Sequence, residues 1–421
     1  MKILHTSDWH LGNLFYGNDR LPEHKHFLSW LFNQIKEQKP DALLISGDVF
    51  DNSNPSPASQ SLYYEFLANA TKECPMMSII IIAGNHDSAS RLEAPRPLLS
   101  RYKVEIRGSV KRKWVKNEDG GQWENDYDDL MIPLSNNEGE KIVVLAVPYL
   151  RSDVVRNVDY SDGVNSFLRS LIEKAREKYP KQRLVMMAHM YLKGAEIAAS
   201  DASEKITIGG QEEVNIDGLT DHPDYIACGH IHKRQSIGSA NWAHYSGSVL
   251  PMSFAEVNYV HGANMVSFSG ENSPIIQFLE YIPQHRLRTL PEGNEELTPK
   301  QLAKVIQEKL RDRSEDKFPS SSFEYVRLRV KIEKASSEDI KNLEDLVSAK
   351  DAVLCKTQKI NTAIDVNTIV GNQKIASIED IVSRDPLETL KEAFVIEHNS
   401  EMSDHQEGML KELLAGINNS D

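Results

Sequence analysis

The chain has 421 residues, of which 40% are hydrophobic and 26% charged, and its formal net charge is −14. This length allows two or three domains with cores of their own, and the composition is that of an ordinary globular protein. No apolar run approaches the roughly 18 residues of a membrane span, and the start MKILHTSDWH is not a secretory signal, so we expect a cytoplasmic protein without a membrane partner. Three distant cysteines without CxxC spacing predict neither disulfides nor a thiolate zinc site.

The negative charge is concentrated toward the end of the sequence. Residues 376–421 contain 11 acidic and three basic residues, which is more than half of the net charge. A nucleic-acid partner needs local positive charge, and the rest of the chain offers basic groups such as KRKWVK (111–116) and EYVRLRVK (324–331). The net charge therefore does not exclude DNA. For 111–116, plain surface exposure and DNA contact are both open.

Up to about residue 281, the sequence alternates between buried strands and amphipathic helices. Continuous apolar runs, typical of strands buried on both faces, occur in KILHTS, DALLISGD, SIIIIAGN, KIVVLAVP, RLVMMAH and DYIACGH. Stretches such as KHFLSWLFNQIKEQ and VNSFLRSLIEKAREKY have apolar residues at helical spacing. Residues 117–130 predict a surface hairpin or loop. Together these features predict a layered α/β domain over 1–282, with central β-sheets flanked by helices.

The pattern changes after about residue 283. Helices near 299–313 and 337–347, with strands near 325–332 and 353, predict a small α+β domain over 283–365. Two acidic amphipathic helices follow in 376–421, and no visible domain buries their apolar stripes. These stripes include Ile381, Leu387, Leu390 and Phe394. We expect the two helices either to bind a partner helix or to pack on this chain itself.

Five of the expected strands end in side chains that can bind metal ions. Side chains two residues apart in an extended chain point the same way, and sites form outside the carboxyl ends of strands in α/β sheets. We therefore expect these side chains to share one site. They are Asp8, His10, Asp48, Asn85, His189, His230 and His232.

The donor set indicates the metals and the reaction. Oxygen and imidazole donors without thiolate suit Mn²⁺, Mg²⁺ or Fe, with Zn²⁺ as a further option. Seven donors are enough for two ions if one carboxylate bridges them. Two ions about 3.5 to 4 Å apart neutralise both the attacking and the leaving oxygen of an in-line displacement at phosphorus. Phosphoester hydrolysis is therefore the expected reaction.

Several residues near these motifs have plainer structural interpretations. We expect Trp9 to fill the core, and His24 and His26 to lie solvated on a polar helix face. Asp51 could neighbour the metal ligands, but the following NSNPSPASQSLYYEF favours an N-cap role for it. His189 alone would be a buried, hydrogen-bonded histidine, and the other donors favour a ligand.

The motifs D-x-H, G-D-x-x-D, G-N-H-D, a lone histidine and G-H-x-H resemble those of the calcineurin-like metallophosphoesterases. The stretches ILHTSDWHLG, GDVFD, AGNHDS, GHIHKRQ and YSGSVLPMSFAE (245–256) are specifically similar to the nuclease subunit of a bacterial complex that repairs DNA double-strand breaks. The resemblance is dense over residues 1–260 and thin afterwards.

The resemblance assigns the donors to two metal ions that share one carboxylate, and it adds two catalytic residues. One set is Asp8, His10, Asp48 and His232, and the other is Asp48, Asn85, His189 and His230. His86 resembles the proton donor or phosphate-orienting histidine of the family, steadied by Asp87.

The resemblance also implies an activity and partners. The activity is that of a Mn²⁺-dependent nuclease, an exonuclease on duplex ends and an endonuclease on single strands and hairpins, in DNA repair, recombination and replication. The unit at 283–365 would cap the site and shape DNA access. The helices in 376–421 would dock on an SMC-type ATPase, in a heterotetramer with two copies of each chain.

A homodimer is implied as well, through helices near 57–70 and 89–102, although these residues could equally pack within one protomer. Two other functions stay open, because two-metal sites serve phosphatases and nucleases alike. One is a small-molecule phosphodiesterase or phosphatase, and the other is a non-catalytic adaptor of the ATPase. The sequence does not predict which residues bind DNA.

Overall fold

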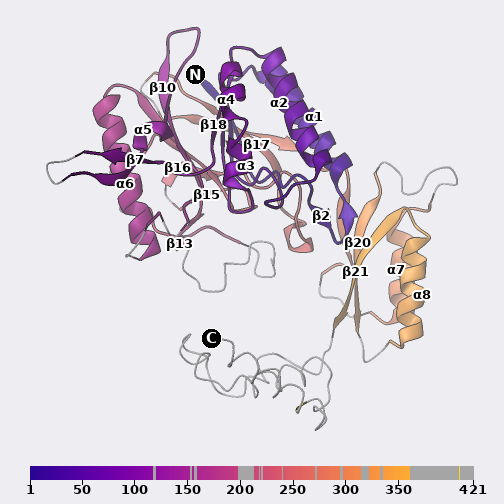
Figure 1. Cartoon of the computed structure of the whole chain (residues 1–421). Helices are drawn as coiled ribbons and strands as arrows, with labels where there is room; N and C mark the ends of the chain where they lie inside the picture. Colours follow the sequence, from indigo (N-terminus) through magenta and orange to yellow (C-terminus); the bar gives the residue numbers. More distant parts are fainter. Residues whose placement is uncertain are drawn as a thin grey trace. The chain divides into compact units, whose positions relative to one another are not determined.

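The computed structural model of the chain (Figure 1) divides into two compact units, Met1–Ile360 and Asn361–Asp421. It describes residues 1–116, 120–151, 154–155, 159–197, 213–217, 219, 221–238, 240–270, 273–293, 297–313, 322–331, 335–360 and 407. The helices expected in 376–421 therefore lie outside the described residues, apart from Glu407. Among the described residues, no helix is long and apolar enough to cross a membrane.

Two six-stranded mixed sheets form the centre of the first unit. The first has the order β18-β17-β1-β4-β5-β6, from β1 (Lys2–Thr6), β4 (Ala42–Ser46), β5 (Ser78–Ile82), β6 (Val104–Arg107), β17 (His261–Ser267) and β18 (Ile275–Tyr281). The second has the order β15-β16-β14-β11-β10-β9, from β9 (Met131–Ser135), β10 (Lys141–Val147), β11 (Arg183–His189), β14 (Tyr225–Gly229), β15 (Gln235–Ile237) and β16 (Ala240–Tyr245). Strands β1, β4, β5 and β6 run parallel, as do β10, β11, β14 and β16.

The six continuous apolar runs are strands buried on both faces, as the sequence predicts. Alternate residues of a strand point to opposite faces, so β4 serves two cores. Its Leu43 and Ile45 lie in the cluster that contacts the helices. Its Leu44 lies in a second cluster with Val144 and Met187 of the other sheet. The two sheets therefore pack face to face and hold their ends at one place.

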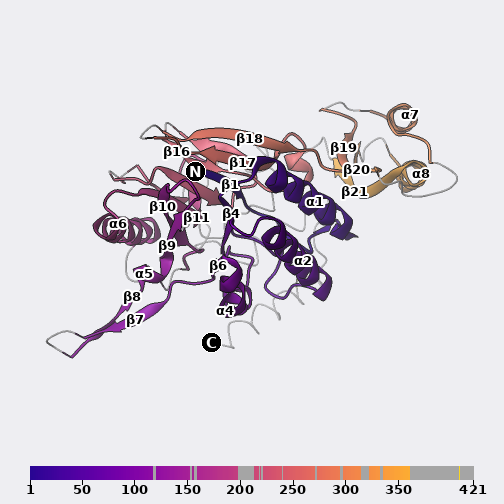
Figure 2. The same cartoon turned by 90° about the horizontal axis from the view of Figure 1, so that it is seen from above.

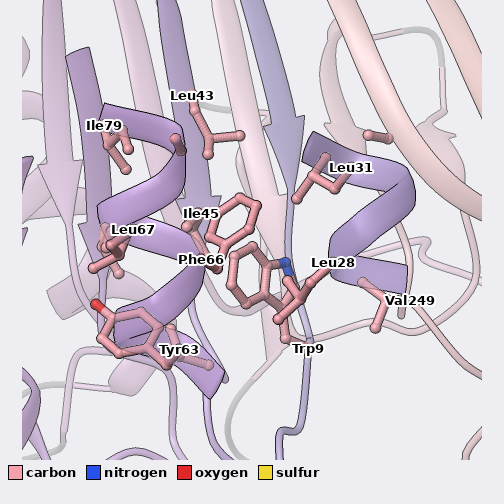
Figure 3. Close-up of a cluster of buried hydrophobic side chains, with 14 of the residues drawn as sticks. Trp9, Leu28, Leu31, Leu43, Ile45, Tyr63, Phe66, Leu67, Ile79 and Val249 are labelled. Carbon is pink, nitrogen blue, oxygen red and sulfur yellow. The ribbon is translucent and has the colours of Figure 1, made fainter. Parts of the chain in front are cut away.

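Helices cover the outer faces of the sheets (Figures 1 and 2). Helices α1 (Leu21–Gln38) and α2 (Pro57–Glu73) lie on the first sheet, and α6 (Tyr160–Lys178) lies on the second. Trp9 is fully buried between α1 and α2 (Figure 3), edge-on to Phe27 and Phe66. The expectation that Trp9 fills the core is confirmed. The fold is the layered α/β architecture that the sequence predicts.

Two local expectations are wrong. Helix α2 begins after Ser56, whose hydroxyl accepts a hydrogen bond from the Ser59 N–H at 3.1 Å, so Asp51 is not its N-cap. The expected helix at 89–102 is instead three short pieces, α3 (Ala89–Glu93), α4 (Arg96–Leu99) and a 3-10 turn, η1 (Ser100–Tyr102). Pro95 lacks the backbone N–H that a continuous helix would need there.

The hairpin expected near 117–130 is formed by β7 (Arg112–Val115) and β8 (Gln122–Asn125), and it projects from the second sheet (Figure 2). Trp114 and Trp123 face each other across it and are both about half exposed. A short helix, α5 (Tyr127–Leu130), follows. Smaller pairs complete this part, β2 (Leu14–Phe15) with β3 (Asn18–Asp19) and β12 (Tyr191–Leu192) with β13 (Glu213–Val214).

The expected elements after residue 283 are also present. A parallel sheet in the order β19-β20-β21 consists of β19 (Arg286–Leu290), β20 (Glu324–Lys331) and β21 (Ala352–Ile360). Helices α7 (Pro299–Lys309) and α8 (Ser337–Ser348) connect its strands and share an apolar cluster with the sheet. A second cluster joins Tyr325 of β20 to Phe15 and to Phe254 of the 3-10 turn η2 (Phe254–Glu256). We call residues 283–360 the cap segment, after the role that the resemblance implies for residues 283–365.

Candidate metal centre

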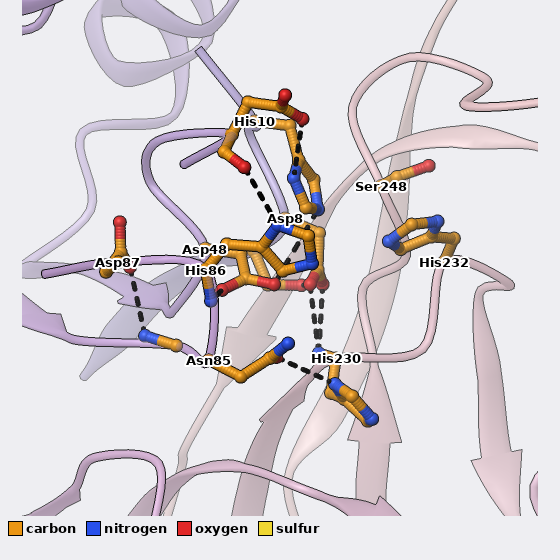
Figure 4. A network of polar contacts seen from close by, with 12 residues as sticks. Asp8, His10, Asp48, Asn85, His86, Asp87, His230, His232 and Ser248 are labelled. Carbon is orange, nitrogen blue, oxygen red and sulfur yellow. Dashed lines mark hydrogen bonds and ion pairs between the residues drawn. The ribbon is translucent and has the colours of Figure 1, made fainter. Parts of the chain in front are cut away.

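The seven expected donors lie together where strands of both sheets end. Figure 4 labels all of them except His189, which contacts Asp48 and Asn85. Asp8 and His10 follow β1, Asp48 follows β4 and Asn85 follows β5, all in the first sheet. His189 is the last residue of β11, and His230 and His232 follow β14, in the second sheet. The face-to-face packing of the sheets thus brings together residues that are more than 200 positions apart in the sequence.

Five of the seven donors, together with His86, form three overlapping groups, within each of which the ligand atoms lie no more than 4.8 Å apart. The groups are Asp8 with His10 and His232, His10 with Asp48 and His86, and Asp8 with Asp48 and His189. Asn85 joins them through its Oδ1 atom, which lies 2.9 Å from Nε2 of His189 and 3.1 Å from Nδ1 of His230. The groups overlap at Asp48, Asp8 and His10, so one carboxylate can serve two ions.

Four of these residues have a backbone conformation that side chains disfavour. Asp8, His10, Asp48 and His230 have positive φ angles of 53°, 45°, 48° and 98°. Such residues cost on the order of 1–3 kcal/mol each and persist where the surroundings fix them. Here the N–H groups of Asp8 and His10 donate to the carbonyls of Gly47 and Asp48, at 3.1 and 3.0 Å. The fold thus stabilises strained backbone at four of the seven expected ligands.

Glycines allow the strand ends to approach His189. A Cβ atom on Gly229 would lie 1.9 Å from the carbonyl oxygen of Ser46 and 2.9 Å from Nδ1 of His189. Gly47 has a φ of +91°, and a Cβ there would lie 2.3 Å from the same ring nitrogen. Both positions therefore need glycine for steric reasons.

His189, which is buried, and His230, which is half-buried, have opposite pKa shifts. Burial lowers the pKa of His189, but the charge of Asp48, whose Oδ2 lies 3.3 Å away, outweighs it and raises the pKa to about 9. Burial, reinforced by the charge of His189, lowers the pKa of His230 to about 3. Burial raises the pKa of Asp48, yet His189 and His10 together hold it well below its usual range. Protons therefore compete with any cation for these donors.

His10 provides the test of whether a metal ion fits these residues. Its ring is almost completely buried, and neither nitrogen has a hydrogen bond. The nearest carboxylate oxygens lie 3.4 Å away on Asp51 and 3.7 Å away on Asp48. An unpartnered buried polar atom is costly, and a cation between His10 and these carboxylates would remove that cost. The donor set thus fits divalent metal binding.

His86 and Asp87 follow β5 and have different surroundings. The Nδ1 atom of His86 is 2.8 Å from the carbonyl oxygen of Asp51, and its backbone N–H donates to Oδ1 of Asp48 at 2.9 Å. Asp87 instead accepts the backbone N–H groups of Val49, Phe50 and Gly84, at 3.1, 2.9 and 2.9 Å. Burial and the charge of Asp48 raise the pKa of Asp87 to about 6. The Asp51 carbonyl therefore orients the ring of His86, and Asp87 connects the loops.

The structure adds one residue that the sequence does not single out, Glu256, which contacts His232. Asp51 lies beside His10, which agrees with its alternative interpretation as a neighbour of the ligands, and it accepts a hydrogen bond from Asn13. His24 is buried rather than solvated, and burial lowers its pKa to about 3. Its signal was the helical spacing that places it on the apolar face of α1. His26 is exposed, as expected, but its Nδ1 lies 2.8 Å from the Tyr281 hydroxyl.

The basic run at 111–116 is paired with acidic residues. Lys111 contacts Glu93 at 2.8 Å, and Lys113 contacts Asp126 and Asp128 at 3.0 and 2.8 Å. Exposed ion pairs of this kind contribute little to stability, but they neutralise the charges of Lys111 and Lys113. They favour the structural interpretation for these two of the four basic residues.

Comparisons with known proteins agree with this geometry. Residues 1–234 match the family model described as calcineurin-like phosphoesterase. A protein of Rhodobacter capsulatus, named as the SbcD component of the nuclease SbcCD, is 33% identical over 344 residues, which cover 78% of this chain and 80% of that protein. Proteins of the same name from Escherichia coli K12 and Bacillus subtilis 168 are each 30% identical, and the matches cover 65% and 66% of their lengths.

Proposed function

Because this chain belongs to the calcineurin-like phosphoesterases and, within them, to the SbcD nuclease family, we propose that it is a metal-dependent DNA nuclease that hydrolyses phosphodiesters. The observation that carries this proposal is the convergence of seven oxygen and imidazole donors on one site, five of them buried. A site with this many donors, backbone strain and buried unpartnered nitrogens is typical of function rather than of packing.

Two ions would divide the donors, with Asp48 shared. Asp8, His10, Asp48 and His232 would hold one, and Asp48, Asn85, His189 and His230 would hold the other. When bound, a pair of divalent ions stabilises the charge on the attacking and leaving oxygens. Mn²⁺ is the proposed cofactor, since oxygen and imidazole donors suit it, and Mg²⁺, Fe and Zn²⁺ are the alternatives.

The residues of the chain orient the substrate and move the proton. The Nδ1 atom of His86 donates to the Asp51 carbonyl, which fixes the ring and leaves Nε2 for the phosphate. We assign His86 the role of donating a proton to the leaving oxygen or orienting the scissile phosphate, a role that contributes on the order of 10² to 10⁴ in rate. Asp87 holds the loops that carry His86 and Asp48 together.

The proposed assembly follows the names of the relatives. They are components of SbcCD, and we propose that this chain acts with an SbcC-like SMC-type ATPase, two copies of each, on DNA in the cytoplasm. In this proposal 283–365 caps the site and 376–421 binds the ATPase. We also propose a homodimer through residues 57–70 and 89–102, where the large side chains of Tyr64, Leu98 and Tyr102 are exposed.

The test is hydrolysis of a hairpin DNA oligonucleotide with Mn²⁺ by the purified full chain. We expect Asp8→Ala to abolish cleavage and His86→Gln to slow it by about 10² or more. His222→Ala is the matched control, because His222 is an exposed histidine stacked on Trp242. Cleavage at the wild-type rate by the first two variants would disprove the proposal.

Two further readouts separate the alternatives. If the protein hydrolyses nitrophenyl phosphate esters with Mn²⁺ and leaves DNA intact, it is a small-molecule phosphodiesterase or phosphatase. If it does not bind two equivalents of metal, the adaptor function is favoured. Co-purification of a long coiled-coil ATPase from the native cell tests the proposed partner.

A further inference from the structure

We propose that Glu256 is a positioning residue for the metal ligand His232, and that η2 connects this ligand to the cap segment. The inference rests on the proposed function, because the metal role of His232 is part of it. It concerns a carboxylate outside the seven donors.

The first observation is the contact between the two side chains. Nδ1 of His232 lies 3.1 Å from Oε1 of Glu256, and both side chains are buried. A carboxylate at this distance accepts the Nδ1–H proton, so Nε2 is the nitrogen left for the metal ion. A carboxylate partner of this kind also makes a metal-binding imidazole more basic and holds its ring in place.

The position of Glu256 is itself fixed by the surrounding backbone. Its Oε2 accepts the N–H of Met252 at 2.8 Å, so each carboxylate oxygen has a separate partner. The Ser253 hydroxyl accepts the N–H of Ala255 at 3.1 Å and closes the turn. The segment 251–256 is therefore a rigid turn that presents Glu256 to His232.

The second observation is that the other side of this turn contacts the cap segment. Phe254, two residues before Glu256, is buried in one cluster with Phe15 and Tyr325. The guanidinium of Arg327 lies over the Phe254 ring, 5.0 Å from its centre. Tyr325 and Arg327 belong to β20, so η2 contacts the cap segment and the metal ligand at the same time.

A second chain of contacts reaches the same turn. The Tyr325 hydroxyl donates to Glu23 at 3.0 Å, and Glu23 forms a buried two-bond ion pair with Arg20. Arg20 in turn donates to the carbonyl of Pro251 at 2.6 Å. Residues 251–256 are thus connected to β20 directly through Phe254 and indirectly through Pro251. A shift of the cap segment would change how Glu256 holds His232, and so the affinity of one of the two metal sites.

The experiment is a Mn²⁺ titration of the full chain by calorimetry, comparing wild type with Glu256→Ala and Glu256→Gln. Loss of a carboxylate behind a metal-binding histidine weakens binding by about 10- to 100-fold. We expect this loss for one equivalent in Glu256→Ala, while the other equivalent keeps its affinity. Glu256→Gln should retain part of the affinity for this equivalent, because the amide oxygen still accepts the Nδ1–H of His232.

Two variants complete the design. Glu324→Gln is the matched control, since Glu324 pairs with Arg288 within the cap segment, and both equivalents should bind as in wild type. Phe254→Ala should weaken the same equivalent as Glu256→Ala, because it removes the contact of η2 with β20. If Phe254→Ala leaves both affinities unchanged, the connection to the cap segment is wrong.

Two results would contradict the positioning role of Glu256. Unchanged affinities in both Glu256 variants would overturn it, and so would an equal loss of both equivalents together with a lower melting temperature in EDTA, which indicates general unfolding. If the wild-type protein binds fewer than two equivalents, the proposed function fails, and this result is distinct from a failure of Glu256 alone.

Discussion

His5 is a fully buried histidine whose two ring nitrogens have neutral partners. Nε2 donates to the carbonyl of Cys228 at 3.2 Å, and Nδ1 accepts from the hydroxyl of Tyr225 at 2.9 Å. Burial, with the charge of His244 as a second cause, lowers its pKa from 6.5 to about 3. His5 is therefore neutral in the native state at any ordinary pH.

This neutral histidine makes the free energy of unfolding depend on pH. Between pH 6.5 and about 3 the unfolded chain binds one proton more than the native chain at this position, so stability falls as the pH falls through that window. From pH 7.5 to 5.5 the loss attributable to His5 is about 1.4 kcal/mol. The decrease in the free energy of unfolding between pH 7.5 and 5.5, measured by urea denaturation, should be smaller by this amount in His5→Gln than in the wild type. Equal losses in the two proteins would contradict the prediction.

Gly229 occupies a position where the structure leaves no space for a side chain. In Gly229→Ala the new Cβ would meet the Ser46 carbonyl at 1.9 Å, so β14 must shift away from β4 and take His230 with it. We expect Mn²⁺ binding to weaken by more than about 10-fold. Gly270→Ala is the control, because open space surrounds Gly270 and an added Cβ there meets no other atom. Its φ of +54° gives this variant a backbone conformational cost without a steric clash. Equal metal affinities in the two variants would show that the close approach is not needed.

At the scale of the elements, the start of α2 decides whether Asp51 or Ser56 is the N-cap of this helix. The hydroxyl of Ser56 caps the helix, whereas Asp51 lies beside His10. Ser56→Ala should therefore lower the free energy of unfolding by about 1 kcal/mol. Asp51→Ala should cost less, measured by urea denaturation in EDTA so that metal binding does not contribute. A larger cost for Asp51→Ala would restore the N-cap interpretation.

The elements also show what the sequence can predict and what it cannot. Runs such as LLIS in β4 and IIII in β5 are apolar at nearly every position, so their burial on both faces could be predicted. The apolar runs do not predict β18, because this strand lies at the edge of its sheet and most of its side chains are exposed or half-buried. The break after α3 could have been predicted, because Pro95 interrupts the helical pattern there.

The site divides in the same way. Donors that directly follow apolar strands, such as Asp48 and His230, could be predicted from their positions alone. Glu256 could not, because it lies in an irregular turn and reaches His232 only through the tertiary fold. The Asp51 carbonyl that orients His86 is a backbone group, and no sequence pattern marks it.

At the scale of the whole molecule, metal binding connects the two sheets. Donors come from β1, β4 and β5 on one side and from β11 and β14 on the other. A metal concentration of 100 times the Kd should therefore stabilise the native state by about 2.7 kcal/mol. We expect Mn²⁺ to raise the melting temperature of the wild type above its value in EDTA.

The same measurement on Asp48→Ala separates stability from function. Asp48 has a strained backbone, and its carboxylate lies in a buried, densely charged site. Without metal, the variant should melt lower than the wild type, because it leaves the buried charge of His189 without its carboxylate partner. Its response to Mn²⁺ should be lost. A full Mn²⁺ response in Asp48→Ala would contradict the bridging role.

Anomalous diffraction at the manganese edge, from crystals of the full chain grown with Mn²⁺, tests the central claim most directly. The account predicts two anomalous peaks about 3.5 to 4 Å apart, both within bonding distance of the Asp48 carboxylate. A single peak, or peaks that do not share Asp48, would contradict it.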